Sequence, residues 1–448
     1  MTGRTATRPA TGGWLLTAVA LAGFLTTLDN TVVTVALPSI QRDLGASLAA
    51  LEWVATGYLL TFAGLMLAGG RLADVWGHRT TLLTGLMLFT AASFAAGLAG
   101  TVGPLVAARL VQGAGAALVL PATLAVLAVL DERRRSTGVA VWMASGAAAL
   151  ALGPVVGGYL SQHAHWSWVF LVNVPLGAAV VALAAVTVPA SWPVRRALDV
   201  PGVLASAVFL ASGTFALIHG GEHGYGSPAV VAALALCAGG GAAFAVAERR
   251  AADPMVDLRL FAVRAFAGGV AAQVLWGLGV NGVFFYTAIF LQGALGFTPT
   301  GSGVAFVPLA LLVVLVTPLA PLLERRVGAG RTVAAGLTLV AGGMAVAATL
   351  EAGDGWGRLL PAVCAIGIGS ALTMPLGSAV LGAVPASRAG VAGGVFSVSR
   401  EVSGLFGIAA VGAVVQAAPS FAAGYATGLL AAAGLVLAGA LIALRTLK

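Results

Sequence analysis

The chain has 448 residues, of which 59% are hydrophobic and 8% are charged, with a formal net charge of +8. Water-soluble domains carry about 25% charged residues, so this composition excludes a soluble globular protein and predicts an all-α polytopic membrane protein. The positive charge does not indicate nucleic-acid binding, because the arginines lie singly or in short clusters between apolar segments rather than along one face.

Apolar segments long enough to cross a bilayer, about 20 residues each, follow one another along the chain. The breaks between them contain turn residues, as in GLAGTVGP and GEHGYGSP. The first segment is too long for a cleavable signal peptide, so we expect a retained span. The predicted spans are 14 in number, at residues 14–37, 50–70, 80–99, 103–127, 137–160, 167–189, 201–219, 228–247, 265–289, 302–322, 331–350, 358–381, 390–415 and 424–444.

Basic residues are distributed unequally between the two sides of the predicted membrane. If the N-terminus is cytoplasmic, 19 of the 23 Lys and Arg residues fall in inner segments, Arg42 and Arg358 fall outside, and Arg109 and Arg400 lie within spans. Cytoplasmic loops of polytopic proteins carry an excess of basic residues. The asymmetry therefore predicts that both termini are cytoplasmic, which fits an even number of spans.

An acid interrupts the first predicted span. In GFLTTLDNTVVTVALPSI, Asp29 and Asn30 lie within apolar sequence that contains no Lys or Arg. Inserting such a carboxylate into a bilayer costs about 2.5–3.5 kcal/mol. We therefore expect Asp29 to have a partner, a water-filled cavity or a function.

The inner turn after the second span brings an acid and a base close together. In GGRLADVWGHRTTLL, Gly70, Asp74, Gly77 and Arg79 form a tight charged turn. The simpler interpretation is an ordinary turn that obeys the charge asymmetry. The alternative is a latch, in which Asp74 caps a helix N-terminus or pairs with an arginine to hold one conformation.

A second charge lies within span four. Arg109 is several residues inside the span, in its outer half, where basic residues are otherwise scarce. Gln112 and Gly113 follow at i+3 and i+4 and share its helical face. An arginine near a span end can extend to the interface, but we favour an ion-pair or functional role.

Span five carries small residues at helical spacing. In SGAAALALGPVVGGYL, Gly146, Ala149, Gly153 and Gly157 form a stripe along one face. Such stripes allow close approach of helices, and Pro154 permits a kink. The stripe predicts close packing, and whether that packing also serves a moving interface stays open.

Three further places offer candidates. Arg400 and Glu401 are adjacent, so they project about 100° apart on a helix and need not pair. Glu401 is either a proton or cation site or a hydrated residue near the inner end. Glu52 sits with Trp53 at a predicted interface, where a Trp is an expected anchor. One set of polar and aromatic residues has two interpretations: it lines a cavity for an amphipathic ligand, or it packs between helices. Its members are Asn30, Gln112, Trp276, Asn281, Phe285 and Arg400.

The sequence contains no Walker A glycine loop, zinc-ligand spacing or nucleophile elbow. Cys237 and Cys364 are far apart within apolar segments, which favours neither a disulfide framework nor a metal site. We therefore expect no metal and no cofactor.

Taken in order, the motifs resemble the major facilitator superfamily, specifically its 14-span drug:proton antiporter branch. LDNTVVTVALP, GRLADVWGHR, RLVQGAGAA and GPVVGG are similar to that branch's motifs in span one, loop 2–3, span four and span five. WSWVFLVNVPLG resembles a later segment, although Ser167 stands where a basic residue is usual. LLERRVGAGRT in loop 10–11 is a weak internal echo of LADVWGHRTT in loop 2–3.

The resemblance implies a major facilitator fold, with two related six-helix bundles and two extra transmembrane helices between them. The implied division is an N-terminal bundle at residues 1–190, the two additional helices with a cytoplasmic linker at 191–260, and a C-terminal bundle at 261–448.

The resemblance also implies alternating access, with an inward proton driving export of lipophilic, including cationic, drugs or antibiotics. It implies no enzymatic activity, a monomer, and the cytoplasmic membrane of a bacterium. Asp29 is then the first proton or substrate site, Arg109 its electrostatic partner and Glu401 a secondary candidate. The implied inner gate comprises Gly70, Asp74, Gly77 and Arg79, and the implied sliding contact comprises Gly153, Pro154, Gly157 and Gly158.

Three alternatives stay open. The first is a dedicated exporter of one endogenous small molecule. The second is an uncoupled or importing transporter on the same fold. The third is a membrane receptor or scaffold, against which the lack of a soluble signalling domain in the sequence argues.

Overall fold

The computed structural model describes residues 11–190, 199–251, 254–385 and 388–447, and within these ranges it contains helices and no strands. Fourteen helical segments are long and apolar enough to cross a membrane, so the predicted all-helical membrane fold is confirmed. Five basic residues used to predict the orientation lie outside the described residues: Arg4, Arg8, Arg195, Arg196 and Lys448.

The first six spans form one bundle. Polar side chains cap two of its helices, because Ser47 accepts the backbone N–H of Ala50 and Asp131 accepts that of Arg134. Span six consists of two helices in succession. The helices of this N-terminal bundle are α1 (Thr11–Leu44), α2 (Leu48–Trp76), α3 (His78–Gly97), α4 (Val102–Ala128), α5 (Glu132–His163), α6 (Trp168–Leu171) and α7 (Asn173–Thr187).

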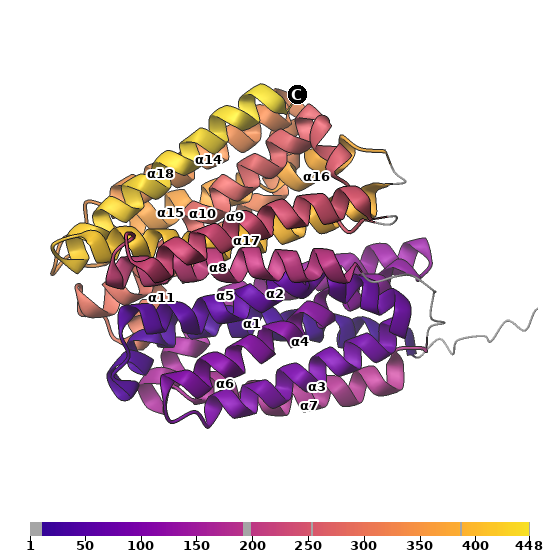
Figure 1. Cartoon of the computed structure of the whole chain (residues 1–448), viewed down its shortest axis with the longest axis horizontal. Coiled ribbons are helices and arrows are strands. Elements are labelled where there is room, and N and C mark those ends of the chain that lie inside the picture. The colour runs from indigo at the N-terminus through magenta and orange to yellow at the C-terminus, as the bar shows by residue number, and fades with distance from the viewer. Residues whose placement is uncertain (1–10, 191–198, 252–253, 386–387, 448) are drawn as a thin grey trace, which may run out of the picture.

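Two further spans follow, and they pack on each other: α8 (Val200–His223) and α9 (Pro228–Arg250). Helix α8 also packs against α2 of the first bundle and against α17 (Ala389–Ala417) of the second. In Figure 1, α8 runs along the boundary between the two bundles. Helix α8 is therefore part of the contact between the bundles.

The last six spans form the C-terminal bundle, in which prolines divide two spans into shorter helices. Pro308, Pro318, Pro321 and Pro375 each stand in the first turn of a new helix, where a missing N–H costs least. The remaining elements are η1 (Leu258–Ala262), α10 (Arg264–Gly293), α11 (Pro299–Ala305), α12 (Val307–Val316), η2 (Thr317–Leu319), α13 (Ala320–Val327), α14 (Ala329–Ala347), α15 (Trp356–Leu372), α16 (Pro375–Gly382) and α18 (Phe421–Thr446).

The internal echo in the sequence corresponds to one repeated turn. Gly77 links α2 to α3 with φ 87° and ψ 145°, and Gly328 links α13 to α14 with φ 88° and ψ 156°. Only glycine adopts this region readily. The same backbone device at the same place in each bundle fits two related halves.

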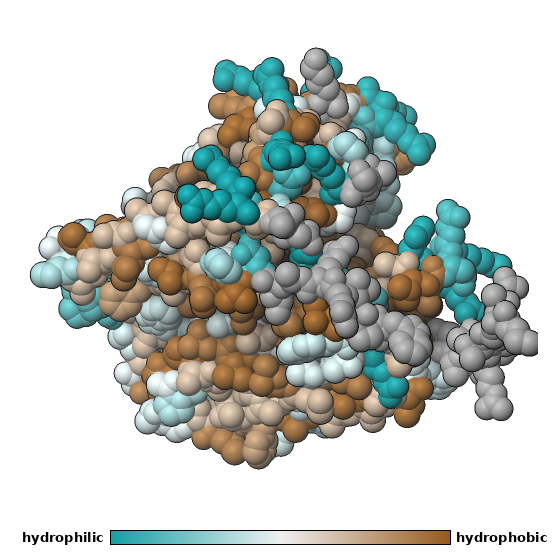
Figure 2. Space-filling view, turned by 45° about the vertical axis from the view of Figure 1, so that its right-hand side comes forward, coloured by the Kyte–Doolittle hydropathy of each residue, from teal (hydrophilic) through white to brown (hydrophobic). Residues whose placement is uncertain are grey.

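The bundles are inclined to each other. Figure 1 shows them closest at the end where α11 lies near α5, and diverging toward the end at which the chain finishes. Figure 2 shows hydrophilic residues gathered at the diverging ends, with apolar residues over the rest of this face. The prediction that both termini are cytoplasmic would place the diverging ends on the inner side of the membrane.

Candidate functional site

Asp29 lies at the centre of a buried polar cluster within the N-terminal bundle. Its side chain on α1 is completely buried. Oδ2 accepts a hydrogen bond from Nη1 of Arg109 at 2.5 Å, and Oδ1 accepts amide hydrogens from Gln112 and Asn173 at 2.7 Å each. All three partners donate, so the geometry suits the ionised carboxylate.

Arg109 is held on two edges of its guanidinium. Nε donates to the backbone carbonyl of Val54 at 3.0 Å, and Nη1 donates to Gln112 at 2.8 Å as well as to Asp29. The cation also lies 4.5 Å from the centroid of the Tyr58 ring. Nη2 is buried without a hydrogen-bond partner among the described residues. Both N–H groups of Nη2 therefore lack an acceptor among the described residues.

The polar cluster includes residues that the sequence analysis did not single out as site residues. Asn173 begins α7 and is completely buried, and its Oδ1 has no hydrogen-bond partner within the described part of the chain. Ser93 of α3 accepts the second amide hydrogen of Gln112 at 2.8 Å. Uncharged polar residues are common enough in spans that neither stands out. The one available signal was an amide in the apolar stretch FLVNVPLG.

The structure separates the residues considered for a ligand cavity. Gln112 and Phe285 are buried, so neither lines an open cavity in this conformation. Asn30, Trp276 and Asn281 are partly exposed on α1 and α10. Asn281 donates to the carbonyl of Gly277 in its own helix at 3.0 Å, and Trp276 has a buried indole N–H without a partner among the described residues.

Arg400 and Glu401 pair with each other, although adjacent residues on a helix need not do so. Nη2 and Nε of Arg400 donate to Oε1 of Glu401 at 2.9 and 3.0 Å. Glu401 is 9% exposed, whereas Arg400 is exposed. The structure therefore places Glu401 beside a solvated cation, outside the Asp29 cluster.

The loop 2–3 residues lie at the diverging end of the N-terminal bundle. Arg79 donates to the carbonyl of Ala185 in the last turn of α7 at 2.5 Å, which neutralises a free helix C-terminus. Gly77 provides the positive φ described above. Gly70 has room for a side chain, since an added Cβ would lie 3.8 Å from Pro121. Asp74 is half-buried.

The small residues of α5 face two different neighbours. Gly153 and Gly157 touch Thr31 and Val32 of α1 so closely that a Cβ would overlap them. Gly158 touches Pro299 of α11 in the same way, across the boundary between the bundles. The predicted stripe packs closely at Gly153 and Gly157 but not at its inner end, because a Cβ added at Gly146 would meet nothing within 4 Å in the described structure.

Pro154 belongs to the face of α5 that meets the C-terminal bundle. Its carbonyl oxygen touches Gly303 of α11 too closely for any side chain there. Gln162, one turn beyond Gly158, accepts the backbone N–H of Thr300 at 3.0 Å. Contacts of α5 with α11 thus close the end of the molecule opposite the diverging ends.

A second buried acid lies at this closed end. Glu52, the fifth residue of α2, is completely buried. Its Oε1 accepts the hydroxyl of Tyr286 at 2.6 Å and the amide of Gln416 at 2.8 Å, from α10 and α17 respectively. The sequence interpretation placed Glu52 at a membrane interface. The structure instead buries it between the bundles, because helices of the C-terminal bundle cover this end of α2.

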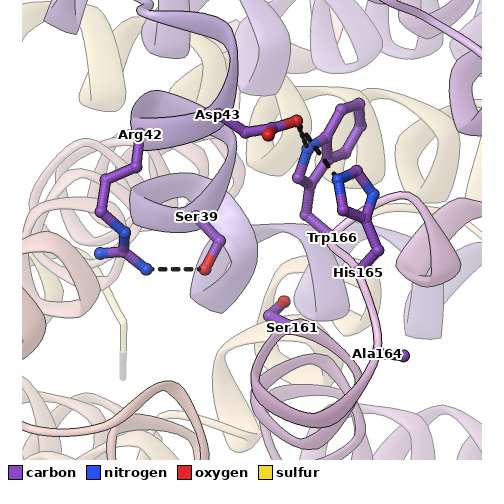
Figure 3. Close-up of a pocket in the computed structure, with 7 residues that line it drawn as sticks. All are labelled: Ser39, Arg42, Asp43, Ser161, Ala164, His165 and Trp166. Atoms are coloured by element: carbon purple, nitrogen blue, oxygen red, sulfur yellow. Dashed lines mark hydrogen bonds and ion pairs between the residues drawn. The ribbon is translucent and has the colours of Figure 1, made fainter.

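A polar cavity of about 320 Å³ opens on the surface at the same end (Figure 3). Asp43 accepts the indole N–H of Trp166 at 2.6 Å and lies 3.3 Å from Nε2 of His165. Arg42 of α1 donates to Ser39, one turn earlier in the same helix, at 3.0 Å. These contacts tie the end of α1 to the loop after α5. The cavity does not reach the Asp29 cluster.

Among the described residues, no group of three or more His, Cys, Asp or Glu side chains is placed to hold a metal ion. A buried carboxylate beside an arginine, as in the Asp29 cluster, is a combination that can bind and release a proton.

Comparison with known proteins gives consistent matches over most of the chain. The family model described as Major Facilitator Superfamily matches residues 19–408. A cephamycin export protein of Amycolatopsis lactamdurans is 38% identical over 422 residues, which cover 91% of this chain and 86% of that protein. The multidrug resistance protein Stp of Mycobacterium tuberculosis is 34% identical over 406 residues, covering 90% of this chain and 75% of that protein.

The fold is also similar to that of solved transporters. The structure of the POT family transporter PepTSo superimposes with a TM-score of 0.72 at 15% identity, covering 98% of each chain. At that identity the likeness concerns the fold alone.

Proposed function

The chain belongs to the major facilitator superfamily, and from that premise we propose that it is a proton-driven exporter of lipophilic antibiotic-like compounds, with cations among the candidates. Export is supported by relatives named for cephamycin export and for multidrug resistance. The protein works as a monomer in the cytoplasmic membrane of a bacterium, with both termini inside, and needs no cofactor besides the proton gradient.

The observation that carries the proposal is the contact between Asp29 and Arg109. A carboxylate at the centre of a span is tolerated in its charged form because Arg109, Gln112 and Asn173 donate to it. Protonation removes its negative charge and releases Arg109, whose Nη2 already lacks a partner in the described structure. Asp29 therefore has two states that differ in the position of a buried cation.

This difference can couple protons to transport. In alternating access, two bundles rock around a central site, and a ligand shifts the equilibrium by its differential affinity for the two conformations. A proton on Asp29 is such a ligand, because it changes the charge within the N-terminal bundle. Opposite preferences of proton and substrate for the two conformations produce antiport.

The relatives favour a second candidate as well. The cephamycin export protein is named for one class of compound, whereas Stp is named for many drugs. Dedicated export of a single small molecule is therefore the second candidate function, and it would use the same coupling mechanism as broad drug efflux. Uncoupled or inward transport is the remaining alternative, and the experiment below separates it from antiport.

We would test the proposal with purified protein in liposomes that contain a trapped pH dye and an acidic interior. Ethidium added outside should cause proton release in the wild type, and Asp29→Asn should abolish it. The matched control is Asp354→Asn, which removes one carboxylate from an exposed loop. Proton release that persists in Asp29→Asn would move the coupling site elsewhere, with Glu401 next. If a panel of compounds that includes cephamycins releases no protons, the antiport proposal fails.

A further inference from the structure

Glu52 is a buried acid that the Asp29 mechanism does not use. Its side chain is completely buried near the start of α2. Oε1 accepts two hydrogen bonds, from Tyr286 at 2.6 Å and from Gln416 at 2.8 Å. Oε2 is also buried and has no hydrogen-bond partner among the residues described. The carboxyl group is thus satisfied on one oxygen only.

The contacts of Glu52 cross the boundary between the bundles. Helix α2 belongs to the N-terminal bundle, whereas Tyr286 and Gln416 belong to α10 and α17. Gly412 of α17 leaves the space that the carboxyl group fills, since a Cβ there would lie 2.5 Å from Oε1. A parallel contact joins Gln292 of α10 to the carbonyl of Val35 on α1 at 2.9 Å. Glu52 therefore sits inside the contact that closes this end.

The charges around Glu52 do not compensate an ionised carboxylate. Within the described chain no cation forms an ion pair with it. The titratable groups that interact with it are Tyr286, Tyr225 after α8 and Glu222 near the end of α8. Helix α17 contributes the uncharged Gln416. A buried charge without a partner is costly, so the closed contact is compatible with a neutral carboxyl group.

We propose that Glu52 is a second proton-binding site, and that its protonated form seals the outer end of the transporter. In the closed end, a neutral carboxyl keeps Oε1 as the acceptor for Tyr286 and Gln416 while the proton occupies Oε2. When the outer end opens, Glu52 meets water and ionises. A proton taken up from outside then favours closure between α2, α10 and α17, which returns the transporter to the inward-open conformation.

The role of Glu52 in the transport cycle rests on the proposed proton-driven function. The closure of the outer end as a function of pH, however, can be measured without substrate. Thr101 and Ala352 are exposed at the closed end, one in the N-terminal bundle and one in the C-terminal bundle. Spin labels on Thr101→Cys and Ala352→Cys, after Cys237→Ser and Cys364→Ser, report the distance between the bundles in full-length protein in nanodiscs.

The distance distribution would be recorded from about pH 5 to about pH 9, a range wide enough for a perturbed carboxyl group to titrate. In the wild type the ratio of closed to open outer ends should fall by roughly tenfold or more over this range. Glu52→Gln keeps the acceptor and cannot ionise, so it should remain closed throughout. Tyr286→Phe removes one hydrogen bond and should lower the closed fraction at acidic pH. Glu132→Gln, an exposed acid at the other end, should behave as the wild type.

The possible results separate this inference from the proposed function. A distance that does not change with pH in the wild type, or the same pH response in Glu52→Gln and wild type, would overturn the Glu52 site even if antiport is present. A pH response that disappears in Glu52→Gln would support it even if the liposomes show no antiport. If Glu52→Gln fails to fold, Tyr286→Phe decides, and a closed fraction equal to that of the wild type counts against the seal.

Discussion

Arg109 and Asp29 form an ion pair that joins α4 to α1 inside the N-terminal bundle, with 2.5 Å between Nη1 and Oδ2. Both side chains are buried, and the arginine also bonds Val54 on α2. One guanidinium thus connects three spans. The pair has a structural role in addition to its proposed role in proton coupling.

Arg109→Lys should separate charge from geometry. A lysine keeps the positive charge but cannot reach Asp29 and Val54 along two edges at once. Losing one hydrogen bond to a charged group costs about 1.5–3 kcal/mol, so we expect a lower melting temperature in detergent and weaker antiport. The control is Arg134→Lys, because Arg134 pairs with Asp131 in an exposed position, where changes stay within about 0.5 kcal/mol. Equal melting temperatures for the two variants would show that the charge alone matters.

The sequence indicated the charged residues of this site and Gln112, but it did not single out Asn173 and Ser93. A charge in a span is costly, so Asp29 and Arg109 were identifiable from composition alone. Asn173 and Ser93 carry no such signal, and their role depends on contacts of α7 with α1 and of α3 with α4 that no local pattern encodes. Glu52 was misplaced for a related reason. The local sequence around an acid near the end of a span is the same whether water or another bundle covers that acid.

The fold was predicted more completely than the packing of its helices. The 14 spans follow from length and hydrophobicity, and the structure has them. The glycines of α5 showed that helices approach closely but not which ones. Gly157 faces α1 in the same bundle, and Gly158 faces α11 in the other. Two adjacent residues on a helix point about 100° apart. Only the tertiary structure shows which neighbouring helix each of them faces.

Asn173→Ala should destabilise the protein more than the same change at Asn281. Asn173 donates to the Asp29 carboxylate, whereas Asn281 donates to a carbonyl of its own helix. A hydrogen bond to a charged group is worth about 1.5–3 kcal/mol and an ordinary one about 1 kcal/mol. Thermal unfolding of both variants in one detergent measures the difference. An equal loss at the two positions would mean that Asn173 adds nothing specific to the carboxylate.

Gly77→Ala and Gly328→Ala should each lower stability by about 1–3 kcal/mol, because a side chain is strained at φ near +87°. Their effects should add, since the turns lie in different bundles. Gly70→Ala is the control within the same motif: its φ is helical, a Cβ has room, and alanine favours the helix by about 0.5–1 kcal/mol. A loss of transport in Gly70→Ala without a loss of melting temperature would point to gating rather than folding.

The loop between α14 and α15 should respond to acid through Asp354. The backbone N–H of Glu351 and, to a lesser extent, Arg358 hold the pKa of Asp354 below its ordinary value of 3.8. A lowered pKa means that the contribution to loop stability is present above 3.8 and is lost as the pH falls through the lower folded value. Hydrogen exchange at the Glu351 amide, corrected for intrinsic rates, should accelerate there in the wild type. Asp354→Asn should show no such step.

Gly158→Ala tests whether α5 forms a moving contact with the other bundle. An added Cβ would overlap the backbone carbonyl of Pro299, which cannot rotate away as a flexible side chain can. Overpacking of this kind costs about 1–3 kcal/mol. Because α5 and α11 belong to different bundles, it destabilises the conformation in which the outer end is closed. We expect the distance between labels on Thr101→Cys and Ala352→Cys to shift toward the open population.

Two neighbouring glycines make the interpretation of Gly158→Ala specific. Gly157→Ala would overlap Val32 of α1 within one bundle, so it should lower the melting temperature without favouring the open outer end. Gly146→Ala meets nothing within 4 Å of its Cβ in the described structure, so it should change neither quantity. If Gly158→Ala and Gly157→Ala alter the label distance equally, the contact of α5 with α11 is a passive packing surface. The closing of the outer end must then depend on α2, α10 and α17 instead.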